Sequence, residues 1–377
     1  MKRKLINAAS AIISVLIAAA LLGKSAGVSA GMRSALSLCE NTLVPALFPF
    51  MVLCGFISRS GCGDLLARPF GRLWRRVFKI PEEAGVAVML GMIGGYPVGA
   101  KTIASLLERG IIDDETAERM LCFCVNSGPP FLLTAVGAGL LLDKTAGIIL
   151  LVTQTAASLI IGIVVSVGKK APKRSCVLAE SESAGVALVS AVSGAASSML
   201  LICSFAVLFS GLLAVIEPSV ATGLSGMAKS ILPTMLSGFF EVTSGCVSAA
   251  TLGGEAAFVL TSSCVSFGGL SVIFQVASCF TAGRLRLAQF IFSRLIHIPL
   301  ACVMALPLWR HFCQTASATL ILPPVAQSTE RGWLGTACLM GMCTILLLGL
   351  RQAEELQNHG FWDKIKQRIQ KRGAAWK

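Results

Sequence analysis

Charged residues are scarce in this chain of 377 residues: they make up 14%, against about 25% in an average soluble domain. This scarcity argues against a soluble domain, and 55% hydrophobic residues with a mean hydropathy of +0.78 indicate a protein that crosses a membrane several times. The net charge is +13, but the basic residues lie between apolar runs, where they report orientation rather than nucleic-acid binding. We therefore expect an all-α polytopic membrane protein.

Motifs for metal binding and soluble catalysis are also scarce. Three histidines, His297, His311 and His359, are too few and too scattered for a metal site, and neither HExxH nor GxxxxGK[ST] occurs. The 14 cysteines form no CxxC pair and mostly lie in apolar runs, where a free thiol behaves as a small hydrophobe. We expect no enzyme and no cofactor, apart from H⁺ or Na⁺ as a coupling ion. A transporter ranks first, a scaffold second and an intramembrane enzyme third.

About eight apolar runs reach the roughly 20 residues that a membrane-spanning helix needs. They cover 5–22, 36–57, 119–142, 145–167, 195–216, 255–281, 286–308 and 333–350. Two further apolar segments, 84–107 and 230–252, are interrupted near their middles by Gly, Pro and polar residues. We predict that each forms a re-entrant helical hairpin, which enters and leaves on one side. The first run imitates a secretory signal peptide, but its length favours an uncleaved helix.

The basic residues separate cleanly when both interrupted segments are hairpins. The cytoplasmic side then receives Lys2, Arg3, Lys4, Arg59, Arg68, Arg72, Arg75, Arg76, Lys79, Lys169, Lys170, Lys173, Arg174, Arg284, Arg286 and the basic tail. The outer side keeps Lys24, Arg33, Lys144, Lys229, Arg310 and Arg331. Reading either hairpin as a full crossing destroys this asymmetry, so the positive-inside rule predicts two hairpins and both termini in the cytoplasm.

This topology divides the chain into consecutive parts. They are N-terminal helices (1–58), a basic amphipathic helix (59–83), a first repeat unit with its following helix (84–168), a cytoplasmic loop (169–194), a second unit with its preceding helix (195–281), C-terminal helices (282–350) and a basic amphipathic tail (351–377). The two amphipathic stretches are predicted to lie on an anionic lipid surface, or to dock on a partner protein.

The two interrupted regions share a pattern. Gly94-x-Tyr96-x-Val98 matches Gly238-x-Phe240-x-Val242, and Cys124-Val125-x-x-Gly128 matches Cys264-Val265-x-x-Gly268 in the same order. Because the predicted hairpins enter from opposite sides, 84–142 and 230–281 would form an inverted repeat whose tips meet near the bilayer midplane, where secondary transporters bind substrate. Chance similarity between Gly-rich apolar helices is the alternative.

These motifs also resemble a known family. GGYPVGAK (94–101), FCVNSGP (123–129) and FFEVTSG (239–245), with the acidic connector around Gly110, are similar to the YlbJ-type sporulation integral membrane proteins, which carry two nucleoside-recognition Gate domains. The resemblance covers about residues 36–350. It implies a fold similar to concentrative nucleoside transporters, a role in endospore formation and movement of dipicolinic acid across the outer forespore membrane. Nucleosides and other small solutes stay open as substrates. The second unit lacks the amide and prolines of the first, so equal roles are not expected.

The candidate substrate-binding residues lie at the predicted tips and at the helix breaks that follow them. They are Gly95, Tyr96, Gly99, Lys101, Asn126, Ser127, Gly128, Glu241, Thr243, Ser244 and Ser266. Glycines let the backbone approach a ligand closely, hydroxyl and amide groups offer neutral hydrogen bonds, and half-helix N-termini attract carboxylates. Homo-oligomerisation is also expected from similar transporters.

Five ionisable or aromatic residues in these segments have two readings. Tyr96 could stack on a planar ligand or serve in helix packing. Lys101 could meet an anion or snorkel to the cytoplasmic face. Glu241 could bind a coupling cation or proton, or pair with Lys101. Arg294 and His297 share one helix face and could pack or relay protons.

Overall fold

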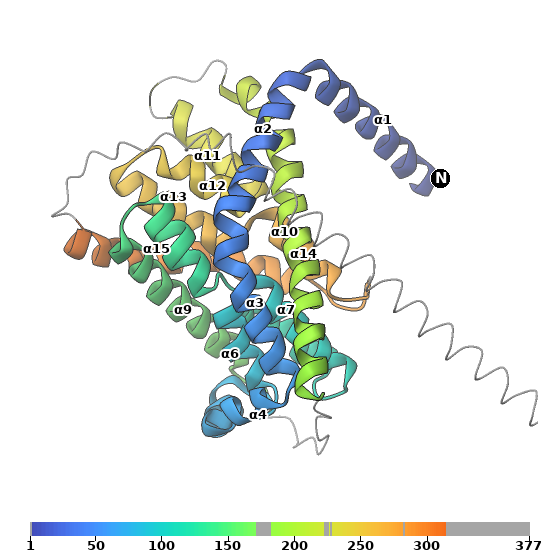
Figure 1. Cartoon of the computed structure of the whole chain (residues 1–377), viewed down its shortest axis with the longest axis vertical. Coiled ribbons are helices and arrows are strands. Elements are labelled where there is room, and N and C mark those ends of the chain that lie inside the picture. Colours follow the sequence, from blue (N-terminus) through green and yellow to red (C-terminus); the bar gives the residue numbers. More distant parts are fainter. Residues whose placement is uncertain (1, 171–181, 222–225, 227, 282, 314–377) are drawn as a thin grey trace, which may run out of the picture.

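The computed structural model describes residues 2–170, 182–221, 226, 228–281 and 283–313. Within these ranges every regular element is a helix (Figure 1). Five of the described helical stretches are long and apolar enough to cross a membrane: Ser25–Arg59, Lys144–Ser166, Ala184–Pro218, Gly254–Ser278 and Ala288–Cys313. The predicted spans 5–22 and 119–142 are not among these five, and the predicted span 333–350 and the predicted amphipathic tail lie outside the described residues, so the expected eight crossings stay a prediction.

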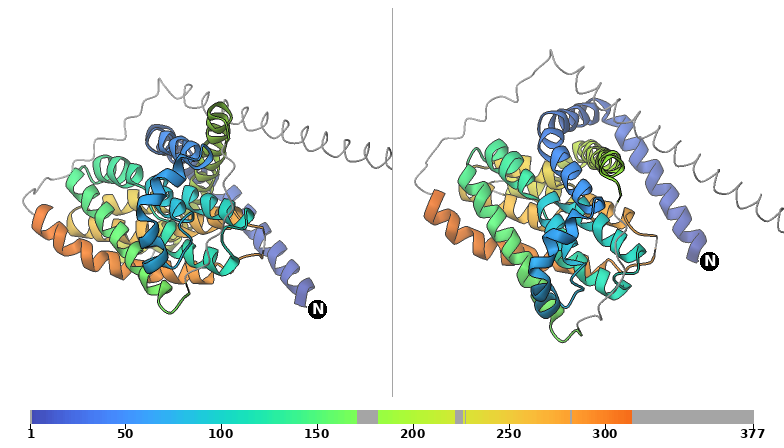
Figure 2. Two further views of the ribbon diagram at one scale, coloured as in Figure 1. Left: turned by 90° about the horizontal axis from the view of Figure 1, so that it is seen from below. Right: turned by 60° about the horizontal axis from the view of Figure 1, so that its bottom comes forward.

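Two long helices run side by side along one edge of the body. Helix α2 (Ser25–Leu38) continues through a π-helical turn, η1 (Cys39–Leu43), into α3 (Val44–Arg59), and packs antiparallel to α10 (Ala184–Ala221). The two helices approach so closely at Gly31 that a Cβ on this residue would lie 2.9 Å from the Ser210 carbonyl oxygen. Helix α1 (Lys2–Gly23) projects away from the body (Figure 2). Since α10 begins at Ala184, the expected loop 169–194 is wrong over its last residues.

The basic segment after α3 packs on protein more than predicted. It consists of α4 (Cys62–Ala67), η2 (Arg68–Phe70), α5 (Gly71–Leu73) and the π-helical η3 (Trp74–Phe78). Trp74 and Phe78 are buried, and the Phe78 ring stacks on Phe123 with centroids 5.3 Å apart. Buried Arg119 donates to the Phe78 and Lys79 carbonyl oxygens at 3.2 and 2.8 Å. A helix resting wholly on lipid is therefore the wrong description, because its largest aromatic residues face the body.

Both interrupted segments fold as two short helices that meet at a sharp turn. In the first, α6 (Gly85–Gly94) and α7 (Tyr96–Glu108) join at Gly95, whose φ of +83° suits glycine. In the second, α11 (Ala228–Phe240) and α12 (Val242–Ala250) join at Glu241. The chain turns back at each junction, so residues on either side of it come into contact. Gly91 approaches Gly99, and Gly238 approaches Gly245.

Two segments predicted as single crossings are broken in the middle. Segment 119–142 consists of α8 (Asp114–Cys124), five non-helical or cap residues (125–129) and the π-helical η4 (Pro130–Leu140). Segment 255–281 consists of α13 (Gly254–Phe267) and α14 (Gly269–Ser278), with Gly268 between them at φ +84°. The proline pair stands at the start of η4, where proline is tolerated, and the left-handed Gly268 ends α13.

Helices α9 (Lys144–Ser166) and α15 (Ala288–Cys313) pack against each other and close the other side of the body. Asp113 lies in the connection between α7 and α8, outside the long apolar stretches. It caps α8 by accepting a hydrogen bond from the Thr116 backbone nitrogen at 2.8 Å. Hydrogen bonding by Thr116 favours the charged carboxylate and lowers the pKa of Asp113.

Candidate functional site

Each hairpin packs a pair of glycines against one cysteine of the broken helix that follows it. A Cβ on Gly91 or Gly99 would lie 2.0 or 2.2 Å from the Cys124 carbonyl oxygen. In the second unit, a Cβ on Gly238 or Gly245 would lie 2.4 or 2.9 Å from the Cys264 sulfur. The cysteines matched by sequence therefore occupy equivalent places, and only glycine permits this contact.

Each hairpin tip also meets the break of its own unit. A Cβ on Gly128 would lie 3.0 Å from the Gly95 nitrogen, and a Cβ on Gly269 would lie 3.2 Å from the Glu241 Cα. Gly95 and Glu241 are thus the equivalent tip residues. The sequence match of Gly94 with Gly238 is wrong by two residues here, because it compared residue types and could not locate the turn.

The two tips and the first break border one cavity of about 50 Å³, named here the tip cavity. Its wall includes tip residues from both hairpins and polar residues from the first break and α14: Gly95, Tyr96, Ser127, Glu241, Thr243 and Gln275. Space of this size holds only a few water molecules. A planar dicarboxylate would therefore need the hairpins to separate.

At the first break, two side chains bind the carbonyl groups that the broken helix leaves unpaired. Arg294 of α15, fully buried, donates to the Cys122 and Val125 carbonyl oxygens at 2.6 and 3.1 Å and to Asn126 Oδ1 at 3.2 Å. Asn126 Nδ2 donates to the Phe123 carbonyl oxygen at 2.7 Å. A guanidinium at the negative end of α8 is electrostatically favourable, so Arg294 is a structural cation at this position.

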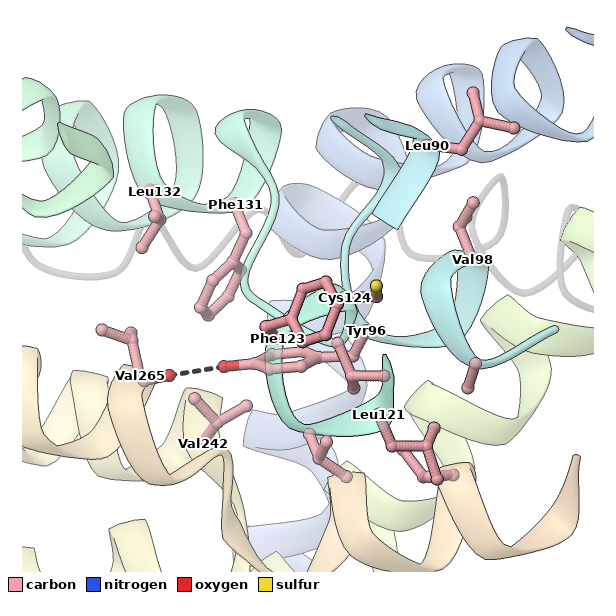
Figure 3. Packing of buried hydrophobic residues seen from close by; sticks show 14 of the residues in the cluster. Leu90, Tyr96, Val98, Leu121, Phe123, Cys124, Phe131, Leu132, Val242 and Val265 are labelled. Atoms are coloured by element: carbon pink, nitrogen blue, oxygen red, sulfur yellow. Dashed lines mark hydrogen bonds between the residues drawn. The ribbon is translucent and has the colours of Figure 1, made fainter. Parts of the chain in front are cut away.

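At the second break, a residue of the first unit, Tyr96, binds a carbonyl oxygen of the broken helix. The Tyr96 hydroxyl donates to the Val265 carbonyl oxygen near the end of α13, at 2.5 Å (Figure 3). Because this bond uses the single hydroxyl proton, the 2.5 Å contact with Ser127 Oγ requires Ser127 to donate to Tyr96. Tyr96 therefore joins the two breaks, and its hydroxyl has its donor already engaged, which favours the packing role.

A buried polar network continues from the breaks into α9 and α15. Ser158 donates to Asn126 Oδ1 at 2.6 Å and lies 3.3 Å from His297 Nε2. Gln154 Nε2 donates to Ser266 Oγ at 2.8 Å, while His297 Nδ1 lies 3.3 Å from the Ser266 carbonyl oxygen. Arg294 and His297 thus serve one network that fixes both breaks.

Glu241 has a distinct geometry among the candidates, because its carboxylate caps the helix that it precedes. Oε1 accepts from the Thr243 nitrogen at 2.9 Å and Oε2 accepts from the Ser244 nitrogen at 2.6 Å. The residue is 3% exposed and lines the tip cavity. Each carboxylate oxygen can accept a further bond, so the group can still take a proton or a cation.

The remaining candidates lie around the tip cavity or apart from it. Gly128 and Thr243 join its wall, whereas Gly99 packs on Cys124 and Ser266 belongs to the Gln154 network. Ser244 Oγ faces Ser210 Oγ at 3.3 Å. Lys101 donates to the Gly194 carbonyl oxygen at 3.0 Å and lines a separate chamber, so the suggested ion pair with Glu241 is absent from the described contacts.

Sequence reasoning missed Gln154, Ser158 and Gln275. All three are buried in helices that read as apolar runs. A carboxamide inside such a run is costly unless it is hydrogen-bonded, and that cost was the available signal. Separately, Gly27–Gly31 spells G-x-S-x-G but lies within continuous helix α2, whereas a nucleophile elbow needs a strand-to-helix turn.

The chain is similar in sequence to a known membrane protein. The chain is 27% identical to the sporulation integral membrane protein YlbJ of Bacillus subtilis (strain 168) over 314 residues, covering 74% of this chain and 76% of that protein. No family model and no solved structure matches it. Together with its five apolar helical stretches, this similarity makes the chain an integral membrane protein.

Proposed function

We propose that the chain is a carrier of the secondary-transporter type that serves endospore formation by moving a small planar anion, dipicolinic acid, across the outer forespore membrane. The sporulation role is carried over from the relative's name. The substrate comes from the family resemblance, with nucleosides or other small solutes as the alternative. A non-transporting scaffold is the alternative from a different class.

The observation that carries the proposal is that two hairpin tips and a helix break border the same tip cavity. Broken helices expose backbone groups that lipid cannot satisfy, so they are retained where they line a cavity or are buried in protein. The first turns of α7 and α12 both border the tip cavity, through Tyr96 and Thr243. Half-helix N-termini at a central site are how many carriers hold anionic groups.

Ion pairs support the proposed topology. Arg59–Glu182, Lys169–Glu115 and Arg284–Asp114 each join residues that the charge pattern assigns to the cytoplasmic side. Arg310–Glu255 joins two residues assigned to the outer side. In this topology the arms of the first hairpin lead to the cytoplasm and those of the second lead outward, which is the arrangement of an inverted repeat.

Electrostatics then argue for coupling. The Glu241 carboxyl group occupies the N-terminus of α12 and, when it carries a charge, would repel a second anion from the tip cavity. The N-terminus of α7 has no side-chain cap, so its Tyr96 and Val98 N–H groups remain candidates to bind a carboxylate. Protonation of Glu241, or Na⁺ binding to it, would remove the repulsion. The anion and the coupling ion would therefore move together.

Uptake of labelled dipicolinate into proteoliposomes tests this function, with labelled uridine as the comparator. We expect saturable dipicolinate uptake that an inward H⁺ or Na⁺ gradient accelerates, and we expect Glu241→Gln to lose this acceleration because its side chain cannot bind the coupling ion. The matched control is Glu255→Gln, the same chemical change at an exposed residue that pairs with Arg310 outside the tip cavity. Uridine uptake would move the substrate to nucleosides. Uptake of neither solute by folded protein would contradict the carrier.

Alternating access has a separate test. Cysteines at Ser127 and Thr243, on the two sides of the tip cavity, should react with thiol reagents at rates that change when dipicolinate is added. Access through one face only, unchanged by dipicolinate, would contradict movement of the tips.

A further inference from the structure

A second and larger chamber, of about 260 Å³, lies between α3, α7 and α10. We call it the basic chamber. Its walls carry the cations Arg59, Lys101 and Arg109 and the carboxylates Glu83 and Glu182. At this size it approaches the lower range of small-molecule binding pockets, whereas the tip cavity does not.

The helices that form the basic chamber run outward from a common floor. Met51 on α3 and Val98 on α7 line the chamber, and Arg59 and Arg109 lie eight and eleven residues further along the chain. At 1.5 Å per residue these spacings are about 12 and 16 Å along the helices. Lys101 lies only three residues beyond Val98. The chamber therefore has one cation near its floor and two nearer its mouth.

The charges in the basic chamber are incompletely paired. Arg59 pairs with Glu182 at 3.0 Å, while the Lys101 ammonium donates to the neutral carbonyl oxygen of Gly194. One carboxylate oxygen of Glu83 is buried without a hydrogen-bond partner, and so is one of Glu182. Buried polar atoms without protein partners in a roomy chamber are places for water. Counting all five groups, the chamber has one more cation than anions.

Met51 is the shared wall, because it lines both the basic chamber and the tip cavity. It is 4% exposed and lies one helical turn after Leu47, which lines the tip cavity but not the chamber. A methionine has three flexible torsions beyond its backbone and can change position without disturbing its helix.

We propose that the basic chamber is a water-filled entry site for a small organic anion, with Lys101 as its binding cation and Met51 as the barrier between it and the tip cavity. This inference rests on the proposed carrier function and specifies its route. The charge pattern places the mouth of the chamber, at Arg59 and Arg109, on the cytoplasmic side.

Cysteine labelling with anionic and cationic reagents tests how the charges of the basic chamber affect access to it. This experiment does not depend on transport. A cysteine at Ser198, on the α10 wall, reacts with sulfonatoethyl and trimethylammonioethyl methanethiosulfonates of similar size. Exposed Cys62, together with Cys176, Cys338 and Cys343 outside the described residues, is replaced by serine; the parent without Ser198→Cys serves as the blank.

We expect Lys101→Gln to lower the ratio of anionic to cationic labelling rates by about threefold to tenfold, and Glu83→Gln to raise it. Opposite shifts from two single-charge changes cannot come from a general loss of folding. If neither variant moves the ratio, the chamber is not a charged, water-filled site. Dipicolinate at millimolar concentration should slow this labelling in the Ser198→Cys protein but not when Lys101→Gln is added to it; equal protection, or none, would overturn the role of Lys101.

A cysteine at Thr243 tests the barrier. Its labelling should rise at least tenfold with Met51→Ala, because that change joins the two spaces. The matched control Leu47→Ala enlarges the tip cavity alone and should leave access near the parent rate. Equal effects of both variants would overturn the barrier. If labelling behaves as expected but proteoliposomes take up no solute, the chamber stands and the carrier function fails.

Discussion

The two hairpin units share a framework but differ in the chemistry at their tips. Both press a glycine pair against a cysteine of the following helix. The first tip is Gly95, which leaves the N-terminus of α7 without a side-chain cap, while the second tip is Glu241, which caps α12 with its carboxylate. The first tip therefore leaves its helix N-terminus without a side-chain cap, and the second occupies its helix N-terminus with a carboxyl group. Two hairpins of similar geometry thus differ in the chemistry of their tips.

The two helix breaks differ in their length and in the groups that bind their carbonyl oxygens. The first break spans five residues, and its free carbonyl groups are bound by Arg294 from α15 and by Asn126. The second is one left-handed glycine, and a carbonyl group beside it is bound by Tyr96 of the first unit. Stability of the second break thus depends on the position of the first hairpin, which couples the two units physically.

The largest expected effect is the loss of stability when a hairpin glycine gains a Cβ. The loss should be greater where the Cβ meets a backbone atom than where it meets a side chain. Gly91→Ala would place its Cβ against the Cys124 carbonyl oxygen, which cannot move without shifting α8, so we expect a loss of about 3 kcal/mol or more. Gly238→Ala meets the Cys264 sulfur and should cost about 1–3 kcal/mol. The measurement is the thermal midpoint of detergent-solubilised protein.

Double variants sharpen this test. Cys264→Ala removes the clashing sulfur and should rescue much of the Gly238→Ala loss, whereas Cys124→Ala leaves the carbonyl oxygen in place and should not rescue Gly91→Ala. Equal rescue in both units would contradict the difference in their packing.

A medium effect is expected from the groups that bind the free carbonyls. Arg294→Met leaves the Cys122 and Val125 carbonyl oxygens without their donor and should cost about 3 kcal/mol, since each unpaired buried group costs about 1–3 kcal/mol. Tyr96→Phe removes one donor, to Val265, and should cost about 1–2 kcal/mol. Thermal unfolding of both variants beside the parent gives the order. A larger loss for Tyr96→Phe would reverse our ranking of the breaks.

The smallest effect concerns the starts of the two broken helices. Asp113 caps α8, while the N-cap of α13 is Gly253, which provides no side-chain cap. Asp113→Ala should lower stability by about 1 kcal/mol, and Asp113→Asn, which can also cap, should stay close to the parent.

Titration gives this prediction a second readout. The pKa of Asp113 is lowered in the fold, so its charged form contributes stability above the unfolded pKa of about 4 and loses that contribution as the pH falls through the folded pKa. The gap between parent and Asp113→Ala, from unfolding midpoints across pH, should shrink at acid pH. A gap that grows there would contradict this role.

Several features could be predicted because they depend on local chemistry. Hydropathy located the described spans, and the glycines and polar residues at 94–99 and 238–245 located both turns. The exact register of the repeat could not be predicted, since a tip is defined by where the chain reverses. Gln154 and Gln275 were missed for a related reason: a lone amide in an apolar run does not reveal its partner.

Roles within the candidate site were harder to predict than its location. Tyr96 had two readings, ligand stacking or helix packing, and Asn126 was a ligand candidate; in the structure their polar groups bind carbonyl oxygens of the broken helices. An ion pair between Lys101 and Glu241 was one of the options, but Lys101 lies five residues along α7 from Tyr96, about 7.5 Å, and lines the basic chamber.

By itself the sequence determined that this protein is a membrane protein with two interrupted hairpin regions, because apolar length and helix-breaking residues act locally. Only the tertiary structure decided which groups meet. The Gly91–Cys124 contact, the reach of Tyr96 across to α13 and the two cavities that share Met51 all join residues far apart in the chain. Such contacts follow from how the helices pack, which no local pattern of residues encodes.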